Sequence, residues 1–240
     1  MTIQILALET ATEWCSAALF VGGECLEDKV PTGELPTGEL RVREAHAGNR
    51  HSELILPMVQ AIMAEEGIAL TQLDAIAYGE GPGSFTGLRI ACGVTQGLAL
   101  AAGCPIIGIG SLHALAAAAA LETEATGVLA ILDARMGEVY AARYRDGIEV
   151  LPPALYKPEA LPPPLTGECV AGTGFFAYET LLDATWAGLD YRVSALHYPG
   201  AAQVARLAVP RFLAGEGRSA EWAEPVYVRN KVALKKSERP

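Results

Sequence analysis

A glycine-rich loop at residues 79–87, GEGPGSFTG, is the stretch in which residue types and spacing come nearest to an anion-binding site. Glycines let a ligand approach the backbone closely, and hydroxyls and free N–H groups at a helix start attract anions. The candidate binding residues are Gly81, Gly83, Ser84 and Thr86. Such a loop could hold the phosphates of a nucleotide.

Two requirements of nucleotide chemistry are missing around this loop. A P-loop places a lysine directly after its last glycine, whereas the first basic residue to follow here is Arg89. A kinase-type magnesium site would need an acid at the end of the first strand and then a glycine-containing turn. Glu9 supplies the acid, but Ala11 stands where the glycine is needed. We therefore expect the glycines to shape a tight strand-to-helix turn, and a nucleotide site is the less favoured alternative.

Two histidines, His46 and His51, lie near Glu44 and Glu53 and superficially suggest a metal site. Their spacing of five does not align them on one helix face, which needs three or four. We instead expect a helix to begin here, with Ser52 as its cap and Glu53 near the positive end of the dipole. No metal and no other cofactor is predicted.

Strand and helix patterns alternate along the whole chain. The first half predicts strands at 3–10, 15–21 and 24–30, a helix at 51–67, a strand at 73–80, a helix at 84–102 and a strand at 104–110. The second half predicts a helix at 111–124, strands at 127–135, 137–145, 147–151 and 168–174, and helices at 175–184 and 201–215. The tandem repeat PTGELPTGEL, at residues 31–40, is expected to be an exposed loop insertion.

This order corresponds to two βββαβα units in tandem and indicates an α/β fold of two duplicated lobes. The predicted lobes are residues 1–104, with helices that dock a partner, and residues 105–216, followed by a tail at 217–240. The cleft between the lobes is the natural ligand site.

Composition narrows the possible function. Half of the residues are hydrophobic, and the net charge of −10 argues against unaided binding to nucleic acid. The five cysteines form no C-x-x-C pair, so we expect them to be reduced. No apolar run is long enough to span a membrane and no leader is recognised, so a cytoplasmic location is predicted.

Four segments, LALETATEWCSAALF, HSELILPMV, AYGEGPGSFTGLRIACGVTQGLALAAG and PVYVRNKVALK, resemble the TsaB family in the same order. The resemblance implies a two-lobed actin-like, sugar-kinase-like and Hsp70-like fold. It also implies a non-catalytic subunit for making threonylcarbamoyladenosine beside the tRNA anticodon. The implied partners are the transferase TsaD and the ATPase TsaE, with a homodimer when the chain is alone and tRNA reached only through the complex.

TsaD-like chains carry a His-x-x-x-His metal motif, which tests this interpretation. Matching that motif to PIIGIGSLHALAA places its ligand positions at Ser111 and Leu115. Leucine cannot coordinate a metal and serine rarely does. His113 falls between them and is expected at the edge of the core. The alternative is an enzyme of the same fold, either a small-molecule kinase or a metal-dependent acyl transferase or hydrolase.

The helices at 51–67 and 84–102 carry more apolar surface than one sheet contact needs. Two arcs of the second helix are apolar, so one of them is expected to face a partner, although their sequence does not decide which. The alternative is that both helices are enclosed within their own lobe. The expected partner-facing residues are Leu54, Met58, Ile62, Gly87, Ala91, Val94, Leu98 and Ala101.

Overall fold

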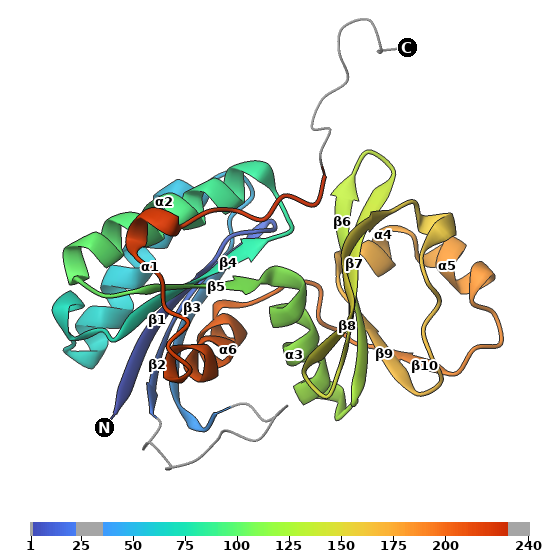
Figure 1. The fold of residues 1–240 in the computed structure, drawn as a ribbon. Helices are drawn as coiled ribbons and strands as arrows, with labels where there is room; N and C mark the ends of the chain where they lie inside the picture. Colours follow the sequence, from blue (N-terminus) through green and yellow to red (C-terminus); the bar gives the residue numbers. More distant parts are fainter. Residues whose placement is uncertain (1, 23–35, 230–240) are drawn as a thin grey trace, which may run out of the picture.

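The structure is a computed structural model that describes residues 2–22 and 36–229, and it contains two five-stranded sheets (Figure 1). The strand orders are β3-β2-β1-β4-β5 and β8-β7-β6-β9-β10. In each sheet three antiparallel strands are followed by two strands that add in parallel. The two sheets therefore share one topology, which confirms the expected duplicated α/β fold.

The first sheet consists of β1 (Ile3–Glu9), β2 (Trp14–Gly22), β3 (Gly38–His46), β4 (Ala75–Gly81) and β5 (Ile106–Gly110). The second consists of β6 (Gly127–Arg135), β7 (Glu138–Arg145), β8 (Ile148–Tyr156), β9 (Glu168–Ala171) and β10 (Tyr191–Val193). The helices are α1 (His51–Glu66), α2 (Phe85–Ala102), α3 (Ser111–Thr123), α4 (Thr173–Ala177), α5 (Glu179–Thr185) and α6 (Ala201–Leu213). Short 3-10 turns are η1 (Leu70–Gln72), η2 (Pro158–Ala160) and η3 (Ala220–Trp222).

Strand β1 is apolar on both faces because helices cover both sides of its sheet. Leu6 and Leu8 belong to the core under α1 and α2. Ile5 and Ala7 belong to the opposite core, under α6. The buried run of β1 thus ends at Glu9, the last residue of this central strand.

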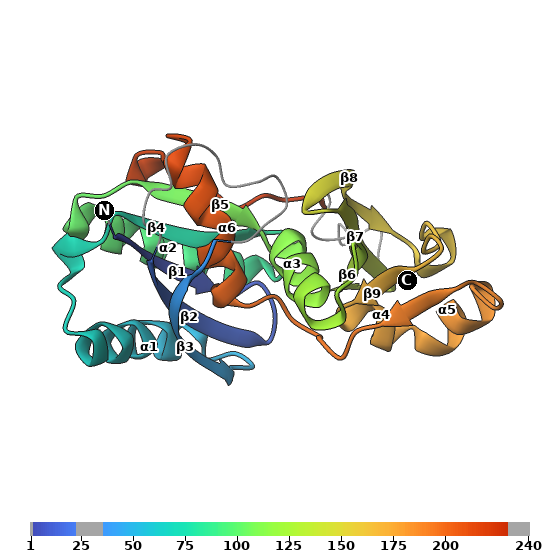
Figure 2. The ribbon, with the colours of Figure 1, turned by 90° about the horizontal axis from the view of Figure 1, so that it is seen from below.

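Helices α3 and α6 lie at the interface between the lobes (Figure 2). Helix α3 follows β5 but contributes Leu112 and Leu115 to the core of the second sheet. Helix α6 follows β10 but contributes Val204 and Ala208 to the core of the first sheet. This exchange corrects the expected lobe limits at residues 104 and 216, because β5 pairs with β4 and α6 packs on the first sheet.

The third strand differs from the sequence prediction. The predicted strand at 24–30 lies outside the described residues, and β3 is formed by Gly38–His46 instead. β3 is an edge strand in which Arg41 and Arg43 pair with Glu66 and Glu65 of α1. Its first three residues belong to the second PTGEL copy, so the repeat is not wholly a loop.

Deleting one PTGEL copy is expected to change the melting temperature very little. The two copies are identical, so deletion of either one leaves a Gly-Glu-Leu that can pair with β2 as residues 38–40 do. Because the entropic cost of closing a loop changes slowly with its length, a connection shorter by five residues should alter the free energy of unfolding only slightly. Circular dichroism melting measures this, and a large fall would show that both copies contribute to folding.

Two further local predictions are corrected. The single helix expected at 175–184 is two short helices, α4 and α5, which meet at Tyr178 with a φ of −128°. Helix α1 begins at His51, and Arg50 occupies the N-cap position without a side-chain hydrogen bond. Ser52 therefore lies inside the helix and does not cap it. The left-handed glycines Gly67 and Gly103 do end α1 and α2 as turn chemistry requires.

Candidate functional site in the cleft between the lobes

A cleft of about 870 Å³ lies between the lobes and is lined by residues of both lobes and of the C-terminal segment. Of the four candidate anion-binding residues, Gly83, Ser84 and Thr86 line it, whereas Gly81 lies buried behind it. Helix α2 begins at this cleft, where the Ser84 Oγ accepts a hydrogen bond from the Gly87 N–H. The glycine-rich loop therefore does reach the ligand-sized space of the molecule.

The glycines of this loop are nevertheless occupied by contacts with the β1–β2 turn. A Cβ at Gly87 would lie 1.9 Å from the carbonyl oxygen of Thr10, and one at Gly83 would lie 2.4 Å from that of Ala11. The Ser84 N–H donates to the Ala11 oxygen at 2.7 Å, and the Thr10 hydroxyl donates to the Gly87 oxygen at 2.8 Å. These glycines thus permit two backbones to meet, which agrees with the tight-turn interpretation.

Glu9, the acid that the sequence offered for a magnesium ion at the end of the first strand, faces the interior. Its Oε1 accepts from the Ala11 N–H at 2.7 Å, and its Oε2 accepts from the Ser111 hydroxyl at 2.9 Å. It is 1% exposed, and burial raises the pKa of its carboxyl to about 7. One oxygen therefore fixes the β1–β2 turn, and the other holds the first sheet to the start of α3.

The positions matched to the metal-binding histidines of TsaD-like chains also have structural partners. Ser111 binds Glu9, and Leu115 is fully buried where a Cβ on Gly172 would lie 2.6 Å from its Cδ2. His113 stacks on Tyr144 with 4.6 Å between ring centroids, and burial lowers its pKa. His113 is thus at the core edge, as predicted. Within residues 2–22 and 36–229 no group of three or more His, Cys, Asp or Glu side chains is arranged to hold a metal ion.

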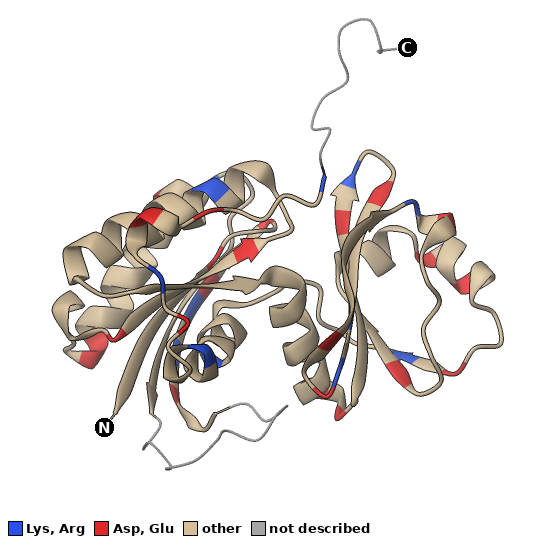
Figure 3. Cartoon of the chain, viewed as in Figure 1, with Lys and Arg blue, Asp and Glu red and all other residues tan. Residues whose placement is uncertain are grey.

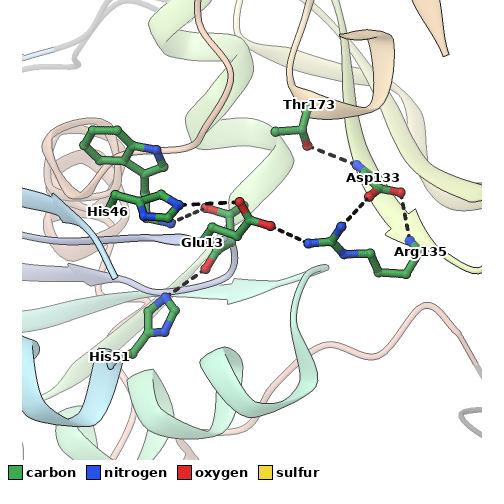
Figure 4. A network of polar contacts seen from close by, with 8 residues as sticks. Glu13, His46, His51, Asp133, Arg135 and Thr173 are labelled. Carbon is green, nitrogen blue, oxygen red and sulfur yellow. Dashed lines mark hydrogen bonds and ion pairs between the residues drawn. The ribbon is translucent and has the colours of Figure 1, made fainter. Parts of the chain in front are cut away.

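His46 and His51 lie on one wall of the cleft but have different partners (Figure 4). The His51 Nε2 lies 2.8 Å from the Thr12 carbonyl oxygen, and the residue is 6% exposed. The His46 Nε2 lies 3.6 Å from the Glu13 Oε2. The two imidazoles are therefore used separately, one to fix the β1–β2 turn and one beside an exposed carboxylate.

An ion pair between the lobes lies in the lining of the cleft, and the sequence alone did not indicate it. Arg135 at the end of β6 lies 2.5 Å from Glu13 of the β1–β2 turn and 3.2 Å from Asp133 (Figure 4). Its hydrogen bond and charge hold the pKa of Glu13 below its usual range. Arg135 and Met136 have φ values of 62° and 57°, in a turn completed by Gly137. In the sequence, Gly137 was the local signal for this tight turn, which directs Arg135 across the cleft.

Of the tail expected at 217–240, residues 217 to 229 pack on both lobes, and residues 230–240 lie outside the described residues. Ile106 and Arg218 exchange two backbone hydrogen bonds at the edge of the first sheet. The Val226 N–H donates to the backbone carbonyl oxygen of Glu80 at 2.7 Å. Arg229 then crosses to β7 and pairs with Glu138 at 2.6 Å. This segment therefore forms another wall of the cleft.

Three of the expected partner-facing residues are also corrected, because Ile62, Gly87 and Ala91 are buried under their own helices. Leu54, Met58, Val94 and Leu98 are half-buried, and Ala101 is exposed. Sequence periodicity found the apolar arcs, but only the position of the sheet shows which residues stay accessible.

Comparison with known proteins places this arrangement in a family. The model of the family described as "TsaD: tRNA N6-adenosine threonylcarbamoyltransferase" matches residues 44–213. The tRNA threonylcarbamoyladenosine biosynthesis protein TsaB of Escherichia coli is 43% identical, over 98% of both chains. The chain belongs to the TsaB family. The TsaB protein of Haemophilus influenzae is 36% identical, over 98% of this chain and 97% of its own.

Structural similarity agrees with this assignment. The solved structure of YeaZ from Pseudomonas aeruginosa has a TM-score of 0.79 and 36% sequence identity, and the match covers 94% of this chain and 99% of that one. The two-lobed α/β fold with two five-stranded sheets is thus that of the TsaB family, and the chain has a role in threonylcarbamoyladenosine biosynthesis.

Proposed function

We propose that this TsaB-family chain is a non-catalytic subunit that supports threonylcarbamoyl transfer to the adenosine beside the tRNA anticodon by binding a TsaD-type catalytic subunit. The non-catalytic part is supported by the positions at which catalysis would be expected. Glu9, Ser111 and Leu115 are each engaged in packing or hydrogen bonds within the chain. In the glycine-rich loop, the backbone at Gly83 packs directly against Ala11, so the space that a phosphate would need there is occupied.

The observation that carries the proposal is the outer face of α2. Gly93, Gly97 and Ala101 follow one another at intervals of four and are all exposed. A Cβ on Gly93 or Gly97 would meet nothing within 4 Å. A glycine inside a helix costs about 1 kcal/mol relative to alanine, so within this chain the two glycines bring a cost and no packing gain. A neighbouring helix that approaches the backbone closely would explain them.

The surroundings of this face support a protein partner. Leu56 of α1 is 42% exposed and Leu100 of α2 is 69% exposed. Phe85–Ala102 is long and apolar enough, by length and composition alone, to cross a membrane, and a third of it is buried in the chain. Because α2 packs along one side on the first sheet, we assign its exposed apolar side to a subunit interface and not to a lipid bilayer.

The proposed assembly follows from this interface. When the catalytic subunit is absent, the same face of α1 and α2 mediates a homodimer. A TsaE-type ATPase joins the complex of the two subunits, and tRNA is bound in the context of that complex. All of these steps take place in the cytoplasm.

The proposal predicts that Gly97→Glu and Leu100→Glu leave the monomer folded but weaken both self-association and binding to the TsaD-type subunit at least tenfold. The glutamate would stay in water in the monomer but would be desolvated in the interface. Leu121→Glu, at a 52% exposed leucine of α3, is the matched control. Analytical ultracentrifugation and a pull-down with the TsaD-type subunit are the measurements, with circular dichroism melting for folding. Normal association of both α2 variants would refute docking through α2.

A further inference from the structure

The turn between β6 and β7 is bound from two sides by groups that belong to other parts of the chain. From the first lobe, Glu13 lies 2.5 Å from the Arg135 guanidinium (Figure 4). From the C-terminal segment, the Arg229 guanidinium lies 2.6 Å from the Glu138 carboxylate. Arg229 also donates to the Arg135 carbonyl oxygen at 3.2 Å and to the Met136 Sδ at 3.4 Å. This turn of the second lobe is therefore held by the first lobe and by the C-terminal segment together.

The C-terminal segment crosses from one lobe to the other just before Arg229. Val226 is bonded to the backbone of Glu80 in the first sheet, whereas Val228 packs against the core of the second sheet beside α3. In Figure 3 acidic and basic positions gather at the end of β6, at the start of β7 and at the end of the described C-terminal segment, where the two lobes face each other. The segment thus joins the lobes a second time, beside the pair of Arg135 with Glu13.

The backbone of the turn depends on such contacts. Arg135 and Met136 have φ values of 62° and 57°, in the left-handed region that residues with a Cβ adopt at a cost in free energy. A backbone of this kind persists where its surroundings fix it from several directions. Glu13 and Arg229 supply two of these directions, so the turn and the contact between the lobes support each other.

We propose that the β6–β7 turn forms, with Glu13 and Arg229, a latch that sets the separation of the lobes beside the cleft. When both ion pairs are broken, the lobes rotate about α3 and α6, the helices at which the chain passes between them, and the cleft widens (Figure 2). The inference goes beyond the proposed function, because it concerns access to the cleft and not the outer face of α2.

The two halves of the latch differ in strength. The side chains of Arg135 and Glu13 are 69% and 45% exposed, so water and salt screen their attraction. Those of Arg229 and Glu138 are 13% and 30% exposed, and their attraction is screened less. A latch made of one weak and one stronger pair can hold the lobes together and still open reversibly.

The test is hydroxyl-radical footprinting of the isolated full-length chain, which measures how fast radicals in the water oxidise each side chain. The reporters are His51 and Leu88 of the first lobe and Tyr140 of the second, which are buried but line the cleft. Phe175 is the internal reference, because it lies in the core on the opposite face of the second sheet.

Glu13→Gln and Arg229→Met each remove one ion pair with little change of side-chain length. Each is expected to raise the oxidation rates of the reporters about threefold, and the double variant about tenfold, with Phe175 unchanged. The matched control is Glu65→Gln, which breaks the similarly exposed pair of Arg43 with Glu65 inside the first lobe and should react like the wild type.

Melting curves show whether each variant is folded, and Glu138→Gln breaks the second pair from its other side if Arg229→Met unfolds. Wild-type oxidation rates at the reporters in the double variant would overturn the inference. If only Tyr227 and Val228 become more reactive, the C-terminal segment frays while the lobes stay together, and the inference is equally wrong. Failure to bind the TsaD-type subunit would refute the proposed function alone, because footprinting uses the isolated chain.

Discussion

Gly87→Ala is expected to destabilise the protein by about 3 kcal/mol, at the upper end of the usual cost of overpacking. The added methyl would lie 1.9 Å from the Thr10 carbonyl oxygen, so either α2 or the β1–β2 turn must move. That movement would also stretch the hydrogen bond from the Thr10 hydroxyl to the Gly87 oxygen. For a chain of this length the melting temperature should fall by roughly 6–12 °C.

Gly93→Ala and Gly97→Ala on the same helix are the controls. A methyl at either position meets no neighbour, so each substitution should stabilise the monomer by about 0.5–1 kcal/mol. Urea unfolding measures all three variants. If Gly87→Ala is as stable as the wild type, the glycine is not required for the contact between the two backbones, and a ligand-binding role for the loop regains support.

Glu9→Gln is expected to make the protein more stable than the wild type at pH 8.5 by about 3 kcal/mol, with little difference at pH 4.5. The carboxyl has a pKa of about 7 in the folded protein against its ordinary value of 4.5, because burial disfavours its charged form. Each unit of this difference corresponds to about 1.4 kcal/mol. The amide of glutamine stays neutral, can accept from the Ala11 N–H and can donate to the Ser111 hydroxyl.

The direction of the pH dependence follows from proton linkage. A carboxyl whose folded pKa is raised contributes its full stability below pH 4.5, and that contribution is lost as the pH rises through 7. Subtracting the free energy of unfolding of Glu9→Gln from that of the wild type at each pH removes the titration of the other groups. Urea unfolding between pH 4.5 and 8.5 provides both curves. A difference that stays constant with pH would show that the pKa of Glu9 is not raised.

These two predictions concern the end of β1, where the fold and the proposed function meet. Glu9, Thr10 and Ala11 connect the first sheet to α3 and to the start of α2. The space beside this turn remains as a cleft, but the groups that would act on a phosphate or a metal are engaged with one another. The molecule thus keeps a two-lobed fold with a cleft, and the docking surface that we propose lies on the exposed side of α2.

The sequence by itself determined the element types and the duplication, because both depend on local periodicity. Short apolar runs bounded by turn residues identified β1, β2, β6 and β7, and glycines at positive φ marked the ends of α1 and α2. Local periodicity failed at β3, whose exposed edge position leaves it rich in charged residues. It also failed at Tyr178, where the backbone interrupts an otherwise helical pattern.

Only the tertiary structure decided which residues of these elements are accessible and which meet. The apolar arcs of α2 look alike in sequence, yet Ala91 is buried on the sheet and Ala101 is exposed, because one arc faces the sheet. Arg135 and Glu13 are 122 residues apart and meet only because the lobes pack through α3 and α6. Burial and long-range contacts depend on how complete elements pack together, and local sequence patterns do not contain that information.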